Sequence, residues 1–177
     1  MIREFSVRPK PSNNKARYAF VASMLISFLL LMTSTSVSSY RGVVSLLGIL
    51  ALALALMIYT KYISPIWFYD ITYDSDGTPV FVVRQQIGKR HTTLCRIDLG
   101  SIVGVKKESS AERREHKTAQ GVVKYTYMPS LDPTESYRIT TSSRYERAEI
   151  LIESSDGFAE LLSAYAAEAR EMCEDDE

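Results

Sequence analysis

The sequence predicts an α+β membrane protein, in which an N-terminal two-helix transmembrane hairpin is followed by a seven-stranded antiparallel sheet and one C-terminal amphipathic helix. Two long stretches near the N-terminus carry no charge. Apolar residues recur with a period close to two after position 66, and at helical spacing after position 156. The 177 residues leave room for one membrane segment and one domain.

The two uncharged stretches are long enough to cross a membrane. Arg17 and Arg41 enclose 23 uncharged residues, and Arg41 and Lys61 enclose another 19. At 1.5 Å per helical residue they reach about 34 Å and about 28 Å, against a hydrocarbon core of about 30 Å. We therefore expect transmembrane helices at about 18–38 and 43–61. A signal peptide is the alternative for the first helix, because basic residues precede it and small residues follow it.

The distribution of charge predicts the orientation of the hairpin. Residues 1–17 form a basic arm with five Lys or Arg residues and one Glu, whereas the turn between the helices carries only Arg41. By the positive-inside rule the N-terminus stays in the cytoplasm. Two crossings return the chain to the same side, so we expect both termini and the β domain on the cytoplasmic face of the plasma membrane.

Small residues predict close packing of the two helices. Ala19, Ser23 and Ser27 recur every fourth residue in the first helix, as do Ala51 and Ala55 in the second. This spacing lets helices approach closely, either within one hairpin or between chains. Because neither apolar stretch contains Asp, Glu, Lys, Arg or His, we expect an anchor and not a transport path.

After Pro65 the sequence alternates between apolar and polar residues, as strands do. The Asp74–Gly77 segment supplies one turn between strands, and Gly88 marks another. The predicted strands are 67–73, 80–86, 90–97, 102–107, 122–128, 136–141 and 148–153.

The last element is an amphipathic helix of about four turns, which Ser155 or Asp156 is placed to cap. Its predicted apolar face consists of Phe158, Leu161, Leu162, Tyr165, Ala169 and Met172. The predicted organisation is a basic arm at 1–17, the hairpin at 18–63, a β domain at 66–173 and an acidic tail at 174–177.

The order of strands and closing helix, together with the segment RIDLGSIVGV at 96–105, resembles the pleckstrin-homology-like (PH-like) fold. In that fold the helix plugs one open end of a bent sheet or partial barrel. The likeness covers about residues 66–173, and the chain looks like bacterial membrane-anchored PH-like domain proteins. The resemblance implies binding of a lipid or a protein, since both occur on this fold. Lipid-binding members carry basic residues around the first loop, whereas the corresponding loop here, 74–78, is acidic.

Basic residues of the second predicted hairpin and of the run 106–117 are candidates to contact lipid or a partner. The run holds five basic and three acidic residues, a balance unlike that of a nucleic-acid tract. It is expected to form a long loop, or one helical turn capped by Ser109 with Glu112. Ordinary solvent exposure is the competing interpretation of these side chains. The candidates are Arg84, Lys89, Arg90, Lys106, Lys107, Arg113, Arg114 and Lys117.

Nothing in the sequence indicates catalysis or a metal or cofactor site. His91 and His116 fall in separate predicted elements, and Cys95 and Cys173 are far apart in the sequence. The sequence contains no HExxH, GxSxG or CxxC motif. We therefore expect no catalytic, metal-binding or cofactor-binding residues.

The function that these features favour is a non-enzymatic, membrane-anchored cytoplasmic interaction module. It would bind or scaffold another membrane protein, for example by adding a strand to an exposed sheet edge. The alternative is an anionic-lipid-sensing or membrane-scaffold domain that uses the basic loop residues. Basic and acidic residues number 21 each, which argues against a nucleic-acid partner. The oligomeric state is left open.

Overall fold

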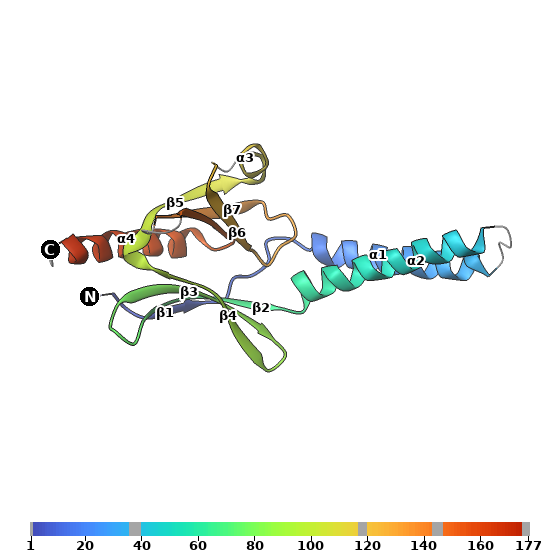
Figure 1. Cartoon of the computed structure of the whole chain (residues 1–177), viewed down its shortest axis with the longest axis horizontal. Coiled ribbons are helices and arrows are strands. Elements are labelled where there is room, and N and C mark those ends of the chain that lie inside the picture. The colour runs from blue at the N-terminus through green and yellow to red at the C-terminus, as the bar shows by residue number, and fades with distance from the viewer. Residues whose placement is uncertain (1, 36–39, 117–119, 143–146, 175–177) are drawn as a thin grey trace. The chain divides into compact units, whose positions relative to one another are not determined.

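The computed structural model describes residues 2–35, 40–116, 120–142 and 147–174, apart from the side chains of Asp156, Cys173 and Glu174 (Figure 1). The chain divides into two compact units. Unit 1 consists of Met1–Ser12 and Ile66–Glu177, and unit 2 is Asn13–Pro65. The N-terminal segment that precedes the apolar helices is therefore part of the same unit as the chain that follows them.

Unit 2 is a hairpin of two apolar helices. Helix α1 (Lys15–Ser34) is followed by α2 (Arg41–Ile58), which a π-helical segment (Tyr59–Ile63) extends. Both helices are long and apolar enough to cross a membrane. Most of their large apolar side chains are exposed within the chain, whereas a core helix of a water-soluble protein would bury them. The prediction of two apolar helices is confirmed; the predicted last residues of the first helix, 36–38, lie outside the described residues.

The two helices pack closely through small residues. Ser23 and Ser27 of α1 and Gly48 and Ala55 of α2 are buried. The Ser27 hydroxyl donates a hydrogen bond of 2.8 Å to the carbonyl oxygen of Gly48. A Cβ atom at Gly48 would lie only 2.9 Å from Cγ of Leu31, so the absence of a side chain permits this approach. Close packing within one hairpin is confirmed, and it depends on Gly48 in addition to the predicted small residues.

The first sheet of unit 1 has the order β1-β2-β3-β4, with every neighbouring pair antiparallel. Its strands are β1 (Phe5–Val7), β2 (Ile66–Tyr73), β3 (Pro79–Ile87) and β4 (Arg90–Asp98). Gly77 and Gly88 adopt positive φ angles of 84° and 60°, which the two tight turns require. Strand β1 was not predicted; it lies within the segment interpreted as a basic arm and pairs with β2.

The second sheet has the order β5-β7-β8-β6. Its strands are β5 (Ile102–Ser109), β6 (Val122–Tyr127), β7 (Glu135–Ser142) and β8 (Arg147–Ile152). Strand β6 pairs with β8 in parallel, whereas the other pairs are antiparallel. The connection from β6 to β7, residues 128–134, contains two prolines and is too long for a tight hairpin, so β6 is not held beside β7.

The seven predicted strands all form, with bounds close to those predicted, but their predicted assembly is not confirmed. The described residues form eight strands in two sheets that do not close into a barrel, and one strand pair is parallel. The additional strand is β1, which is too short to give a periodic signal. The parallel pair depends on contacts between strands that are separated in the sequence.

Two helices complete unit 1, α3 (Ser110–Glu115) and α4 (Asp156–Glu174). The predicted capping box at the start of α3 is confirmed. The Ser109 hydroxyl accepts the Glu112 N–H at 3.3 Å, and the Glu112 carboxylate accepts the Ser109 N–H at 2.8 Å. The predicted amphipathic helix is also confirmed, although Met172 is exposed and does not join its buried face.

The core of unit 1 lies between the inner faces of both sheets and α4. A short 3-10 turn, Leu99–Ser101, leads from β4 to β5 and buries the Leu99 side chain in this core. Aromatic rings of β2, β3 and α4 meet there, with centroid distances of 6.1–6.3 Å among Tyr69, Phe81 and Phe158. The largest fully buried side chains of this core are Tyr69, Ile71, Phe81, Val83, Leu99, Ile102, Ile139, Ile150, Ile152 and Leu162.

Candidate functional site

A groove of about 650 Å³ lies between strand β5 and helix α4. Val105 of β5 and Tyr137 of β7 pack against the core at this groove. The helix contributes small side chains at positions 159, 163 and 167, which share one face because they are four residues apart. Larger side chains there would fill the space. The β5–α4 groove is lined by Val105, Lys107, Tyr137, Ala159, Glu160, Ser163, Ala164 and Ala167.

Strand β5 brings an unpaired backbone edge to this groove. Among the described strands it is hydrogen-bonded to β7 alone. Alternate residues of such an edge strand direct their N–H and C=O groups away from the sheet. The register shifts between Ile102 and Gly104, and pairing with β7 is regular from Gly104 to Ser109. A regular stretch of edge strand therefore borders the groove.

An ion pair restrains one polar side chain at the groove. The Lys107 ammonium lies 2.8 Å from the Glu135 carboxylate, and both side chains are partly exposed. Glu160 lines the opposite, helical wall. The groove thus combines a backbone edge and small side chains with one paired cation and one carboxylate.

Beneath the other face of β5, a buried ionic network joins three strands. Arg138 of β7 is only 4% exposed, and its Nε and Nη2 atoms donate to Glu108 of β5 at 2.6 and 2.7 Å. Its Nη1 atom donates to Glu149 of β8, whose carboxylate lies 3.2 Å from Nε2 of His116. Burial raises the pKa of Glu108, but hydrogen bonding and the charge of Arg138 outweigh burial and hold this pKa below its usual value. The network links β5 to the rest of its sheet.

The predicted contact residues of the first sheet differ from one another in environment. Arg84 donates from Nε to the buried Asp70 carboxylate at 2.5 Å, and Ser6 of β1 also donates to this carboxylate. The hydrogen bond to Asp70 raises the pKa of Arg84. By contrast, Lys89 and Arg90 at the β3–β4 turn are exposed and form no ion pair with a described residue. Arg84 therefore holds strands together, and the other two remain available for contact.

The predicted contact residues of the charged run are mostly engaged within unit 1. Arg113, whose side chain is 10% exposed, donates to Ser136, Asp132 and the carbonyl of Pro133, each at 3.0 Å. Arg114 also binds Asp132, at 2.9 Å. Lys106 is exposed on β5, Lys107 lines the groove, and Lys117 lies outside the described residues. The predicted residues therefore do not form one cluster.

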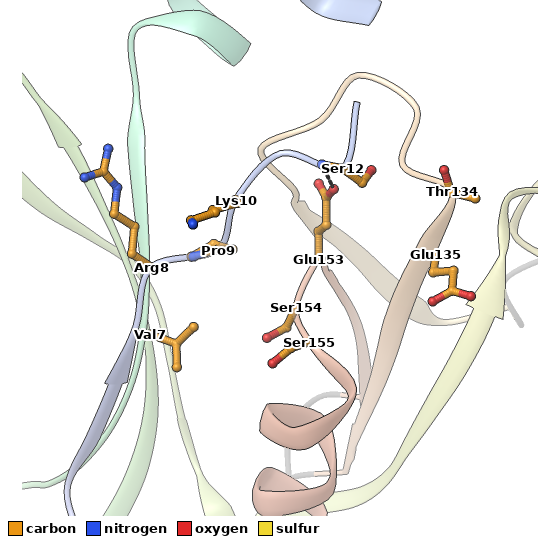
Figure 2. Close-up of a pocket in the computed structure, with 10 residues that line it drawn as sticks. All are labelled: Val7, Arg8, Pro9, Lys10, Ser12, Thr134, Glu135, Glu153, Ser154 and Ser155. Atoms are coloured by element: carbon orange, nitrogen blue, oxygen red, sulfur yellow. Dashed lines mark hydrogen bonds between the residues drawn. The ribbon is translucent and has the colours of Figure 1, made fainter. Parts of the chain in front are cut away.

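The N-terminal segment borders a second cavity of about 490 Å³, which Figure 2 shows with its lining residues. Buried Glu153 accepts the Ser12 N–H at 2.7 Å, and the N–H and hydroxyl of Ser130 at 3.0 and 2.8 Å. Arg8 and Lys10 project away from Glu153 (Figure 2). No motif in the sequence predicts this attachment, because its partners are far apart along the chain.

The described residues contain no group of three or more His, Cys, Asp or Glu side chains placed to hold a metal ion. Burial raises the pKa of Cys95, although hydrogen bonding with Tyr127 acts in the opposite direction, so its thiol is favoured over the thiolate.

The β5–α4 groove offers recognition of a ligand through a strand edge and a surface of small residues. Comparisons of this chain with protein-family models, curated proteins and solved structures find no match.

Proposed function

We propose that this protein is a non-enzymatic, membrane-anchored interaction module whose apolar helices span the membrane and whose unit 1 lies in the cytoplasm. Two helices of sufficient length and apolarity support the anchor. Five basic residues in 1–17, against one in the turn between the helices, support the orientation. The succession of strands and a closing helix also supports the PH-like resemblance as part of this proposal.

The partner is an extended segment of another membrane protein, which pairs with β5 and lies in the β5–α4 groove. The observation that carries this proposal is the position of the groove beside a regular, unpaired edge strand. Main-chain hydrogen bonds to such an edge supply affinity, and the adjacent groove selects side chains of the added strand. The small residues of α4 leave room for the side chains on one face of that strand.

Strand β4, the long edge strand of the first sheet, is less suited to strand addition. The register of β3 and β4 shifts beside Leu94, and the Tyr127 hydroxyl donates to the Leu94 carbonyl at 3.3 Å. Bulges and covering side chains are devices that protect exposed sheet edges from pairing. Because the register of β5 is regular from Gly104 onward, β5 is favoured over β4.

The test places a photo-crosslinking amino acid at Ser163, on the groove wall, in the full-length protein in its native membrane. The captured partner segment is then synthesised and added to the purified protein in lipid nanodiscs. We expect it to slow hydrogen exchange of backbone amides in residues 104–109, and to do so at high salt as well, because backbone pairing depends little on charge screening.

Two tryptophan variants make this test specific. Ala164→Trp fills the groove and should abolish both the crosslink and the slower exchange. Glu171→Trp changes an exposed residue of α4 outside the groove and should leave both unchanged. A crosslink that persists in Ala164→Trp, or a bound segment that leaves the exchange of β5 unaltered, would refute the assignment of the groove.

A further inference from the structure

The segments that connect unit 1 to the apolar helices leave it near the edge at which β2 begins: Ile66 starts β2, and Ser12 is bound by Glu153 beside the second sheet. Strand β1 is antiparallel to β2 and places Val7 opposite Tyr69, so the chain after Val7 runs toward the start of β2 at Ile66. Ser12 precedes α1 by three residues, and Ile66 follows the end of the π-helical segment by three residues. Three residues of extended chain span only about 10 Å.

The turn between β3 and β4 lies at the same edge. Ile66, the first residue of β2, pairs with Gln86, so residues 87–90 extend past the start of β2. Ile87 at this turn is 49% exposed although it is apolar. The acidic turn at 74–78 joins the other ends of β2 and β3 and is therefore remote from this edge.

Four basic residues, Arg8, Lys10, Lys89 and Arg90, belong to this edge, and we call them the basic edge. All four are exposed, and none forms an ion pair within the part of the chain that the structure describes. Of the nearby carboxylates, those of Asp70 and Glu153 are buried and already hydrogen-bonded. Glu135, which lines the same cavity as Arg8 and Lys10, forms its ion pair with Lys107. The basic edge therefore carries positive charge that no described residue of unit 1 pairs with.

We propose that the basic edge binds anionic phospholipid headgroups of the membrane that the apolar helices span, with Ile87 entering the interface between the cations. This inference rests on the membrane anchor proposed above. Exposed Lys and Arg side chains reach anionic headgroups without losing an internal partner, and each strengthens the contact roughly fivefold. An apolar side chain beside such cations adds burial at the interface.

The experiment uses the full-length protein in nanodiscs with a photo-crosslinking amino acid at Ile87, and mass spectrometry of the adducts. In discs that contain phosphatidylglycerol we expect lipid adducts at Ile87. Their yield should fall at least fivefold in discs of phosphatidylcholine alone, and on raising the salt from low to about 0.5 M, because exposed charges are then screened. The same probe at Ser75, in the remote turn, should give no adduct.

Matched charge reversals test the residues themselves. Arg90→Glu should lower the Ile87 adduct yield at least fivefold, whereas Arg3→Glu, which has the same change in charge near the other end of β1, should not. A probe at Leu50 of α2 reports membrane insertion independently, and loss of its lipid adducts would reject the anchor. Adducts at Leu50 with none at Ile87, or an Ile87 yield independent of lipid charge, would overturn the present inference alone.

Discussion

At the scale of single residues, Arg138 is the side chain on which the second sheet most depends. It is buried between two carboxylates, Glu108 and Glu149, that belong to the strands on either side. Removing this guanidinium would leave two buried carboxylates without a compensating charge, which lowers the stability of the fold. The Arg114 side chain, by contrast, is 72% exposed, so solvent screens its ion pair with Asp132.

Replacing Arg138 with Met should lower the free energy of unfolding of unit 1 by about 3–5 kcal/mol, because two carboxylates would stay buried without a cation. Arg114→Met is the matched control and should cost no more than about 1 kcal/mol. Urea unfolding followed by the fluorescence of Trp67, the one tryptophan of the chain, measures both. Equal losses in the two variants would contradict a special role for the buried network.

The same network predicts how stability depends on pH. The pKa of Glu108 is lowered in the folded state from its usual value of 4.5. Its contribution to stability is therefore complete above pH 4.5 and is lost as the pH falls through the lower, folded-state pKa. The difference in unfolding free energy between the native protein and Arg138→Met should shrink as the solution is acidified. A difference that is constant from pH 7 to pH 3 would be inconsistent with this account.

At the scale of elements, the helix hairpin depends on one close approach between α1 and α2. Gly48 accepts a hydrogen bond from Ser27 through its carbonyl oxygen, and its missing side chain leaves space for Leu31. The small residues on both helices allow this approach over several turns. The hairpin is therefore held by its own packing as well as by the short turn.

Replacing Gly48 with Val should destabilise the contact between the helices by about 1–3 kcal/mol, because the added Cβ would overlap Leu31. The measurement is a titration with sodium dodecyl sulphate, followed by the distance between spin labels placed on exposed residues 18 and 60. Gly42→Val is the control, since a Cβ at Gly42 meets no atom within 4 Å. If both variants separate at the same midpoint concentration of sodium dodecyl sulphate, the close approach at Gly48 does not determine the stability of the hairpin.

At the scale of the whole molecule, unit 1 is built from two separate stretches of chain. The apolar hairpin is inserted between β1 and β2, yet β1 pairs with β2 and Ile2 is buried in the core. Glu153 attaches Ser12 to the same unit through its buried carboxylate. The N-terminal residues therefore complete the fold of a domain whose remaining sequence begins after the hairpin.

Joining residue 12 to residue 66 through a flexible Gly/Ser linker of about ten residues should yield a folded unit 1 without the hairpin. Residues 66–177 alone should be less stable by roughly 1–3 kcal/mol, because the β2 edge loses its partner and the hydrogen bond from Ser12 to Glu153 is lost. Urea midpoints from Trp67 fluorescence compare the two proteins. Equal urea midpoints would mean that the N-terminal segment contributes nothing to the stability of unit 1.

The sequence by itself determined the elements whose signals are local. Helical length and apolarity predicted the hairpin, alternation and turn residues predicted the strands β2 to β8, and Ser109 with Glu112 predicted the cap of α3. Such signals depend on neighbouring residues, whose spacing sets which side chains share a face.

Only the tertiary structure decided which strands pair with one another and which charged side chains form ion pairs. Strand β1 has three residues and no periodic signal. Strand β6 pairs in parallel with β8, although β7 is the next strand in the sequence. Lys89 and Arg90 form no ion pair with any residue that the structure describes, whereas Arg84 is bound by Asp70, yet in the sequence all three are basic residues of one predicted hairpin. Whether a charge is paired, and whether a strand edge is open, depends on residues brought together from distant positions, which no local pattern specifies.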